Sequence, residues 1–210
     1  MVLVDLLHRI GGENCAEKFV LIVDESLTDR GKDKFVITSE DNKTCIKGNS
    51  LLSVATGINW YLNHYAHINI SWNQLTIDDI ESHDFPLPEK EERHVCSADY
   101  RYYINSCTFS YSMSTWTWER WEKEIDWMAL HGVNLSLALT GAETVWKNVL
   151  TKLGYSKDEI NDFVSGTGFT AWWLMNNLEG WKYVTWRSNS ARGATYGKNI
   201  YWPNNPRMLA

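Results

Sequence analysis

The sequence predicts an α/β protein in two parts. A small N-terminal α/β domain comes first, and the first β/α units of a truncated (β/α)8 barrel, the TIM type, follow it. Residues 1–85 carry apolar side chains in the order helix, three strands, helix and strand. Residues 95–181 then run strand, loop, helix twice over, which is typical of a parallel β/α repeat. Because such a barrel needs eight strands, two strands predict only its beginning.

The composition places the chain among ordinary globular proteins. It has 210 residues, 44% of them hydrophobic and 22% charged, with a net charge of −6. No basic stripe is present, so we expect no nucleic-acid partner. No apolar run approaches the roughly 20 residues that span a bilayer, so we expect no membrane segment. The N-terminus does not resemble a signal peptide.

In the small domain, apolar spacing predicts a helix over residues 2–10, stopped by Gly11 and Gly12. Ser50 is a predicted N-cap for a second helix. Strand-like runs follow the first helix at residues 19–23, 34–38 and 44–47, and a further strand is predicted at 67–72. The second helix has one apolar face, formed by Leu51, Val54, Ala55, Ile58, Tyr61, Leu62 and Tyr65.

Between the two parts, residues 86–94 combine prolines with a charge run, and we predict a linker there. An exposed loop within one domain is the alternative. At the other end of the chain, residues 182–210 have little apolar periodicity and read as an aberrant or disordered tail. A shifted reading frame or a loosely ordered natural tail would each explain that segment.

The barrel part begins with a predicted strand over residues 99–108 and a second, mostly buried strand over 133–139. The helix between them should end at Gly132. Its predicted core face consists of Trp118, Trp121, Ile125 and Met128. After the second strand comes another helix, closed by Gly154, and Ser156 with Glu159 predicts a capping box for a short helix beyond it.

Chemistry in a β/α barrel lies at the carboxyl ends of its strands. The first strand's end supplies Asn105, Cys107 and Tyr111, and the second is followed by Glu143. An Asn side chain can hold a sugar hydroxyl or an acetamido group. Cys107 reads as a wall residue rather than a nucleophile, since no base lies nearby in sequence. Glu143 is either a carboxylate that faces substrate or a first-turn carboxylate favoured by the helix dipole.

No metal site or cofactor is expected. His64 and His67 are three residues apart, but a metal needs more converging ligands than this segment offers. The four cysteines include no C-x-x-C pair, so neither a zinc ribbon nor a thioredoxin motif is predicted.

Four consecutive stretches together resemble the α-N-acetylglucosaminidase family, glycoside hydrolase family 89. They are "RYYINSCTFSYS" from Arg101, "WERWEKEIDWMALHGVNL" from Trp118, "LTGAETVW" from Leu139 and "GFTAWWLMNNLEGW" from Gly168. The resemblance implies a small α/β domain, a (β/α)8 barrel and a helical C-terminal domain. It also implies removal of terminal α-linked N-acetylglucosamine from glycans, with retention by two glutamates, a mechanism that suits carboxylates roughly 5–5.5 Å apart.

By this resemblance Asn105, Cys107 and Tyr111 would line the sugar subsite, and Trp172 would form its wall. The family's catalytic glutamates lie on later strands, so we expect no glycosidase activity from these 210 residues alone. The implied partner is a glycan with a terminal α-linked N-acetylglucosamine. The parent enzyme would work outside the cytoplasm, in a periplasmic, secreted or lysosomal setting. The alternative is a non-catalytic carbohydrate-binding or scaffold protein.

Overall fold

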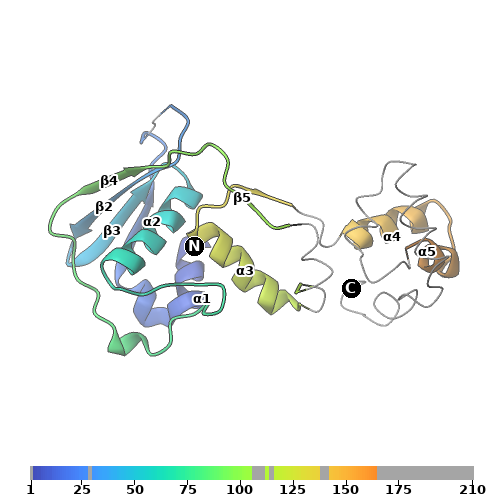
Figure 1. Cartoon of the computed structure of the whole chain (residues 1–210), viewed down its shortest axis with the longest axis horizontal. Helices are drawn as coiled ribbons and strands as arrows, with labels where there is room; N and C mark the ends of the chain where they lie inside the picture. Colours follow the sequence, from blue (N-terminus) through green and yellow to red (C-terminus); the bar gives the residue numbers. More distant parts are fainter. Residues whose placement is uncertain (1, 28–29, 106–111, 114–115, 138–141, 165–210) are drawn as a thin grey trace. The chain divides into compact units, whose positions relative to one another are not determined.

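The structure is a computed structural model that describes residues 2–27, 30–105, 112–113, 116–137 and 142–164. Of residues 142–143 and 161–164 it describes the backbone only. The chain divides into two compact units, one formed by residues 1–103 with 118–136, the other by 104–117 with 137–210. Figure 1 shows the helices and strands along the chain. Helix and strand mix as expected, and the α/β fold class is confirmed.

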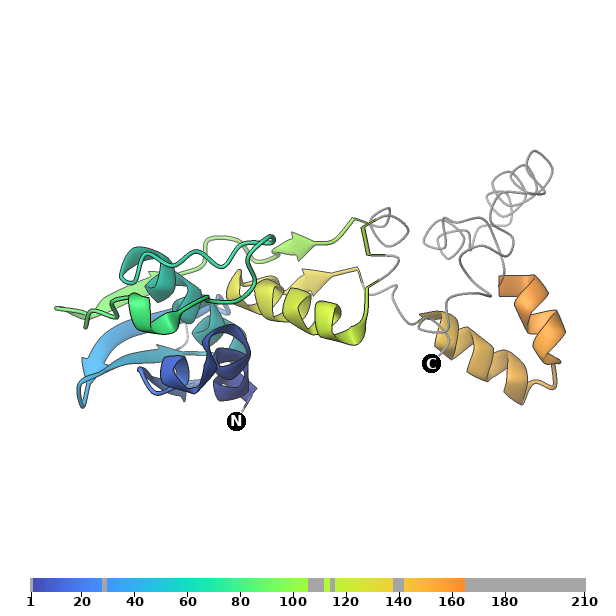
Figure 2. The same cartoon turned by 90° about the horizontal axis from the view of Figure 1, so that it is seen from below.

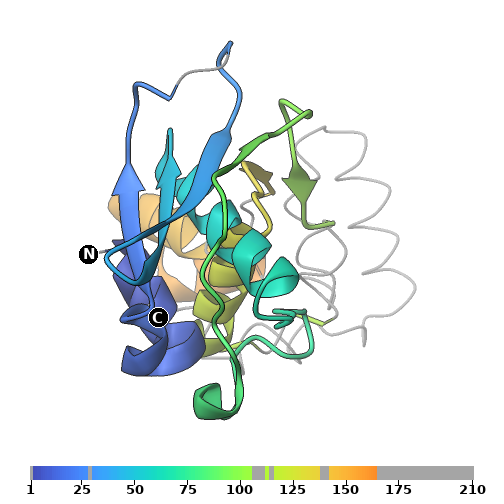
Figure 3. The ribbon, with the colours of Figure 1, turned by 90° about the vertical axis from the view of Figure 1, so that its left-hand side faces the viewer.

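The first unit is built on a four-stranded sheet. Its strands are β1 (Phe19–Val23), β2 (Lys34–Glu40), β3 (Lys43–Gly48) and β4 (Glu92–Val95), in the order β1-β3-β2-β4. β1 is parallel to β3, while β2 is antiparallel to both β3 and β4. Figure 3 shows β1, β3 and β2 side by side. The first three strands agree closely with the sequence prediction.

β4 begins inside the segment predicted as a linker. Its burial alternates between half-buried and exposed residues, and it lies at the edge of the sheet beside β2. An edge strand with one solvent-facing side carries charged residues, here Glu92 and Arg93, so its composition resembles that of a linker. The last three residues of the predicted linker, 92–94, therefore belong to the sheet.

Two helices complete the core of this unit. α1 (Val2–Ala16) runs beyond its predicted end at residue 10. The chain kinks at Gly12 (φ 74°) and then resumes its helical path. α2 (Leu51–His64) packs against β1, β2 and β3. Its buried side chains, Val54, Ala55, Ile58, Tyr61 and Leu62, confirm most of the predicted apolar face, whereas Leu51 is exposed. Ser50 caps α2 as predicted, accepting a hydrogen bond from the Ser53 amide.

The strand predicted at residues 67–72 does not form. Ile68 and Ile70 are buried, as an alternating strand would require. The backbone instead follows the end of α2, with the Ile68 amide donating to the Leu62 carbonyl at 2.7 Å. His67 takes a left-handed φ of 55°, which breaks the extended path. Only an isolated bridge between Ser71 and Gln74 remains, and a 3-10 turn (η1, Ile80–Ser82) follows.

The first β/α unit of the barrel packs with the small domain. β5 (Tyr102–Tyr103) and β6 (Leu135–Ser136) are parallel, with Tyr102 paired to Leu135 and Tyr103 to Ser136. Helix α3 (Trp118–Leu130) connects them in sequence and contacts α2. Figure 2 shows α3 running beside β5 and β6. This strand–helix–parallel strand order is the arrangement with which a β/α barrel begins.

Within the described residues, both barrel strands cover only part of the ranges that the sequence predicts. β5 is limited on one side by Arg101, whose backbone bonds with Asn134, and on the other by Ile104 with a φ of 80°. β6 was predicted to be mostly buried, but both of its residues are exposed. In the part of the chain that the structure describes, its sheet has two strands, which leaves Leu135 47% exposed.

The predicted core face of α3 is largely wrong. Trp118 is 64% exposed and Ile125 45% exposed, while the fully or nearly fully buried residues are Glu124, Asp126 and Leu130. The helix is therefore rotated relative to the expectation from apolar spacing. Its two buried carboxylates are offset by charged and polar partners from the small domain and β5, contacts that periodicity does not reveal.

The described part of the second unit contains two helices in contact, α4 (Ala142–Lys152) and α5 (Lys157–Val164). Gly154 lies between them with a φ of 91°, the conformation expected of a helix-ending glycine. The predicted capping box is confirmed: the Glu159 carboxylate accepts from the Ser156 amide at 2.8 Å, and the Glu159 amide donates to the Ser156 hydroxyl at 3.3 Å.

Candidate functional site

The structure describes only part of the predicted substrate site. Asn105 follows β5 by two residues and is exposed. Glu143 is the second residue of α4, but its side chain lies outside the described residues. Cys107, Tyr111 and Trp172 also lie outside them. The convergence of these five residues on one sugar subsite therefore stays a prediction. What the structure does describe is how the chain is held before it reaches Asn105.

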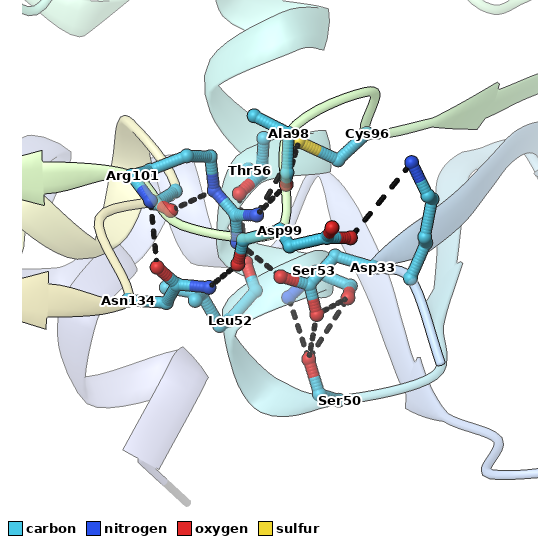
Figure 4. A network of polar contacts seen from close by, with 12 residues as sticks. Asp33, Ser50, Leu52, Ser53, Thr56, Cys96, Ala98, Asp99, Arg101 and Asn134 are labelled. Carbon is cyan, nitrogen blue, oxygen red and sulfur yellow. Dashed lines mark hydrogen bonds and ion pairs between the residues drawn. The ribbon is translucent and has the colours of Figure 1, made fainter. Parts of the chain in front are cut away.

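Arg101 holds the start of β5 (Figure 4). Its Nε donates to the carbonyl of Gly132 in the turn between α3 and β6, and its Nη1 donates to the Ala98 carbonyl at 2.9 Å. Nη1 also lies 3.3 Å from the sulfur of Cys96. The planar guanidinium thereby ties together two loops that flank the first two barrel strands.

The same guanidinium reaches the small domain. Its Nη2 forms an ion pair with Asp33, the residue just before β2, and both side chains are mostly buried. The other Asp33 oxygen accepts from the hydroxyls of Ser53 at 3.1 Å and Ser50 at 3.3 Å. One carboxylate therefore joins the N-terminus of α2, the sheet and the first barrel strand. Charge-assisted, multiply bonded contacts of this kind are stronger than neutral ones.

Asn134 completes the backbone side of this network. Its side-chain oxygen accepts from the Arg101 amide at 2.8 Å, and its side-chain nitrogen donates to the Asp99 carbonyl at 2.8 Å. The Asn134 and Leu135 amides both donate to the Arg101 carbonyl. An amide head offers both donors and an acceptor, so it can continue the β5–β6 pairing beyond the strands.

A second network surrounds Glu124, a carboxylate on α3 with no exposed surface. Its Oε1 accepts from the Tyr103 hydroxyl at 2.7 Å and from the indole nitrogen of Trp72 at 3.0 Å. Its Oε2 lies 2.9 Å from Nη1 of Arg120, whose guanidinium is 5.3 Å from the Trp72 ring centre. Burial and the adjacent carboxylate both raise the pKa of Tyr103.

Arg9 forms a third link between the small domain and α3. Its Nε and Nη2 donate to the two oxygens of Asp126 at 2.6 and 2.7 Å, a two-point pair with the aspartate almost fully buried. This hydrogen bond is the largest influence on the pKa of Arg9, which is raised. This pair and the Glu124–Trp72 hydrogen bond link α3 to the small domain, beside the packing of Leu130 in the hydrophobic core.

None of these three networks was foreseen from the sequence. Arg101, Glu124 and Asp126 read as strand or helix-surface charges, because their partners lie 68, 21 and 117 residues away along the chain. In the described ranges no group of three or more His, Cys, Asp or Glu residues could hold a metal ion. No helix among those ranges is both long and apolar enough to cross a membrane.

The chain is similar to known α-N-acetylglucosaminidases along both of its parts. Residues 3–89 match the family model "Alpha-N-acetylglucosaminidase (NAGLU) N-terminal domain", and residues 101–202 match the model of the TIM-barrel domain of the same enzymes. Human α-N-acetylglucosaminidase is 36% identical over 180 residues, which cover 84% of this chain and 24% of the human protein.

Solved structures agree. A family 89 glycoside hydrolase from Clostridium perfringens, bound to PUGNAc, superposes with a TM-score of 0.67 at 32% identity, over 84% of this chain and 20% of that one. A Glu→Gln double variant from the same organism, in complex with its substrate GlcNAc-α-1,4-galactose, gives 0.67 at 30% identity, over 94% and 22%.

A mixed α/β domain, followed in sequence by a parallel strand–helix–strand unit, agrees with the N-terminal side of a protein built on a β/α barrel. The chain belongs to the α-N-acetylglucosaminidase family, glycoside hydrolase family 89. It spans the N-terminal domain and the start of the barrel domain, about a quarter of the length of the human relative.

Proposed function

We propose that this chain is the N-terminal part of a retaining exo-glycosidase that removes terminal α-linked N-acetylglucosamine from glycans. The observation that carries the proposal is the order of the two family matches, N-terminal domain at 3–89 and barrel domain at 101–202. The parallel pair β5 and β6 with α3 between them agrees with that order. The Clostridium relative's complex with GlcNAc-α-1,4-galactose supports the choice of sugar.

The substrate side of the proposal rests on five residues. Asn105, Cys107 and Tyr111 follow the first barrel strand, Glu143 follows the second, and Trp172 lies further along. Asn105 and Glu143 would bond sugar hydroxyl or acetamido groups, and the Trp172 ring would pack on the apolar face of the sugar. The two catalytic glutamates of a retaining mechanism would come from later barrel strands, so the 210 residues alone should be inactive.

Two measurements test this proposal. The purified 210-residue chain, incubated with an aryl α-N-acetylglucosaminide, should show no turnover. A chimera that places residues 2–164 in the matched N-terminal segment of the Clostridium perfringens enzyme should hydrolyse the same substrate. Turnover by the isolated chain that Glu143→Gln abolishes would contradict the first expectation. A folded chimera that neither hydrolyses the substrate nor binds PUGNAc would contradict the second.

A binding measurement separates the enzyme from the alternative of a carbohydrate-binding scaffold. Tryptophan fluorescence reports sugar binding, because a sugar ring stacked on an indole changes its surroundings. If the isolated chain binds N-acetylglucosamine tightly and Trp172→Ala removes that binding, while the chimera remains inactive, the non-catalytic function is favoured. Hydrolysis by the chimera favours the enzyme whichever way the isolated chain behaves.

A further inference from the structure

Glu124 is an unusual residue to bury. It has no exposed surface and lies on α3, whose other buried residues are Asp126 and Leu130. Moving a carboxylate out of water is costly unless it is paired and hydrogen-bonded, and an apolar residue of similar size would fill the same space without that cost. Packing alone therefore does not explain the presence of a carboxylate at this position.

The contacts of Glu124 indicate that task. One carboxylate oxygen accepts from both Tyr103, at the end of β5, and Trp72, in the small domain. The other oxygen pairs with Arg120, one helical turn away. The carboxylate is thus fixed from two sides by donors on different segments. It can hold the end of β5 in a single position relative to α3.

Tyr103 is held by more than its hydroxyl. Its backbone pairs with Ser136 of β6, and its ring centre lies 4.9 Å from that of Trp127 on α3. Its hydroxyl donates to Glu124 at 2.7 Å. Tyr103, the last residue of β5, is therefore held at its backbone, its ring and its hydroxyl.

The next residue is strained. Ile104 has a φ of 80°, in the left-handed region that a β-branched side chain rarely adopts. Such a conformation persists only where the surrounding structure imposes it, and strained residues of this kind are frequent beside functional sites. The strained residue lies directly between the anchored Tyr103 and Asn105, the first residue of the proposed sugar subsite.

We infer that Glu124 is a positioning residue for the sugar subsite. Through Tyr103 it fixes the end of β5, the strand that Asn105 follows by two residues in sequence. Glu124 itself does not touch the substrate in this account; it acts through the backbone that carries Asn105. The inference rests on the proposed function, because it assigns Asn105 to sugar binding, whereas the anchoring of the strand end stands on the contacts alone.

The anchoring is tested on the 210-residue chain by hydrogen–deuterium exchange of peptides that cover residues 101–105. Tyr103→Phe removes only the hydroxyl that Glu124 binds, and we expect exchange there to become about tenfold faster. Tyr102→Phe is the matched control, since it removes the hydroxyl of the neighbouring, 58% exposed tyrosine of the same strand and should change nothing. Unchanged exchange in Tyr103→Phe, or equal acceleration in both variants, would overturn the anchoring.

A second pair of variants addresses Glu124 directly. Glu124→Gln keeps an acceptor for Tyr103 and Trp72 and should retain most of the protection from exchange, whereas Glu124→Leu should lose it. If Glu124→Leu does not fold, the comparison of Tyr103→Phe with Tyr102→Phe still decides the question. If Glu124→Gln loses as much protection as Tyr103→Phe, the acceptor role assigned to Glu124 is wrong.

The positioning role is tested by kinetics in the active chimera. In Tyr103→Phe we expect KM for the aryl α-N-acetylglucosaminide and Ki for PUGNAc to rise about fivefold to tenfold, with kcat within about twofold of its starting value. A purely structural role would lower the melting temperature and leave KM and Ki unchanged, which would refute positioning. If the unsubstituted chimera folds but is inactive, the proposed function fails and positioning with it, while the exchange result still decides the anchoring.

Discussion

Arg101 and Asp33 form an ion pair although they lie 68 residues apart in the sequence. Arg101 precedes the first barrel strand, β5, and Asp33 precedes strand β2 of the small domain. Asp33 also accepts from two serine hydroxyls at the N-terminus of α2. The first β/α unit of the barrel is thereby fastened to the small domain rather than loosely linked to it. Arg9 with Asp126 and Glu124 with Trp72 repeat this relationship along α3.

Loss of the Arg101 guanidinium should be costly. Arg101→Ala removes bonds to Asp33, Gly132 and Ala98, and we expect the free energy of unfolding to fall by about 2–3 kcal/mol in urea denaturation. Arg93→Ala is the matched control, because Arg93 pairs with Glu91 at an exposed site and should contribute less than about 1 kcal/mol. Equal losses in the two variants would show that the Arg101 network does not hold the unit together.

A side chain at Gly132 should destabilise the fold. It has a φ of 69°, and a Cβ there would lie 2.9 Å from the Thr56 hydroxyl on α2. Gly132→Ala therefore combines backbone strain with a clash, and we expect a loss of about 2–3 kcal/mol. Gly154 has a similar φ of 91° but open space around it, so Gly154→Ala should cost about 1 kcal/mol. Thermal unfolding of the two variants checks this order, and a reversed order would contradict the close approach of the α3–β6 turn to α2.

The stability of the first unit should depend on Glu92 at acid pH. A hydrogen bond from the Tyr65 side chain lowers the pKa of Glu92 below its ordinary 4.5, and the His94 side chain lowers that pKa further. A carboxyl whose folded pKa is depressed stabilises the fold above its unfolded pKa, and this contribution is lost as the pH falls through the folded value. Glu92→Gln should therefore flatten the fall in unfolding free energy below about pH 4.5. If the unfolding free energy falls equally steeply at acid pH in the wild type and in Glu92→Gln, Glu92 does not contribute to the acid dependence of stability.

Three described cysteines should differ in reactivity. Cys15 and Cys45 are fully buried, and burial raises the pKa of each thiol from 9.0 to about 11, whereas Cys96 is partly exposed. Because only the accessible thiolate reacts, iodoacetamide at about pH 8 should modify Cys96 at least about 100-fold faster than either buried cysteine. Peptide mass spectrometry measures the three rates. Comparable rates for Cys15 and Cys96 would mean that the α1–sheet core opens readily.

The parts of this fold that local chemistry determines could be predicted from the sequence. The strand-like runs of β1, β2 and β3, the Ser50 cap of α2 and the capping box at Ser156 each depend on neighbouring residues. The helix end near Gly132 follows from the backbone freedom of glycine. The family resemblance, carried by long continuous motifs, supplied the barrel and is confirmed by the comparisons.

What depends on distant partners could not be predicted. The spacing of Trp118 and Ile125 indicated a core face for α3, but Glu124 and Asp126 are the buried residues, because Tyr103, Trp72 and Arg9 satisfy their charges. Helical periodicity treats every carboxylate as a surface group, so it fails wherever a buried partner exists.

The site was predicted from the rule that barrel strands carry chemistry at their ends. That rule selected Asn105, which follows β5 as expected, and it selected Cys107, Tyr111 and Glu143, whose side chains lie outside the described residues. It could not select Glu124 or Arg101. Glu124 bonds the Tyr103 side chain at the end of β5, and the Arg101 backbone bonds Asn134 just before β5 begins. Residues that hold a site carry no local signature comparable to those that line it.

Hydrolysis of an aryl α-N-acetylglucosaminide by the chimera that carries residues 2–164 in the Clostridium perfringens enzyme is the most direct test of the proposed function. We expect turnover that PUGNAc inhibits, because these residues match the N-terminal domain and the start of the barrel domain of the same family. A soluble chimera with a cooperative melting transition, yet with neither turnover nor PUGNAc binding, would contradict it.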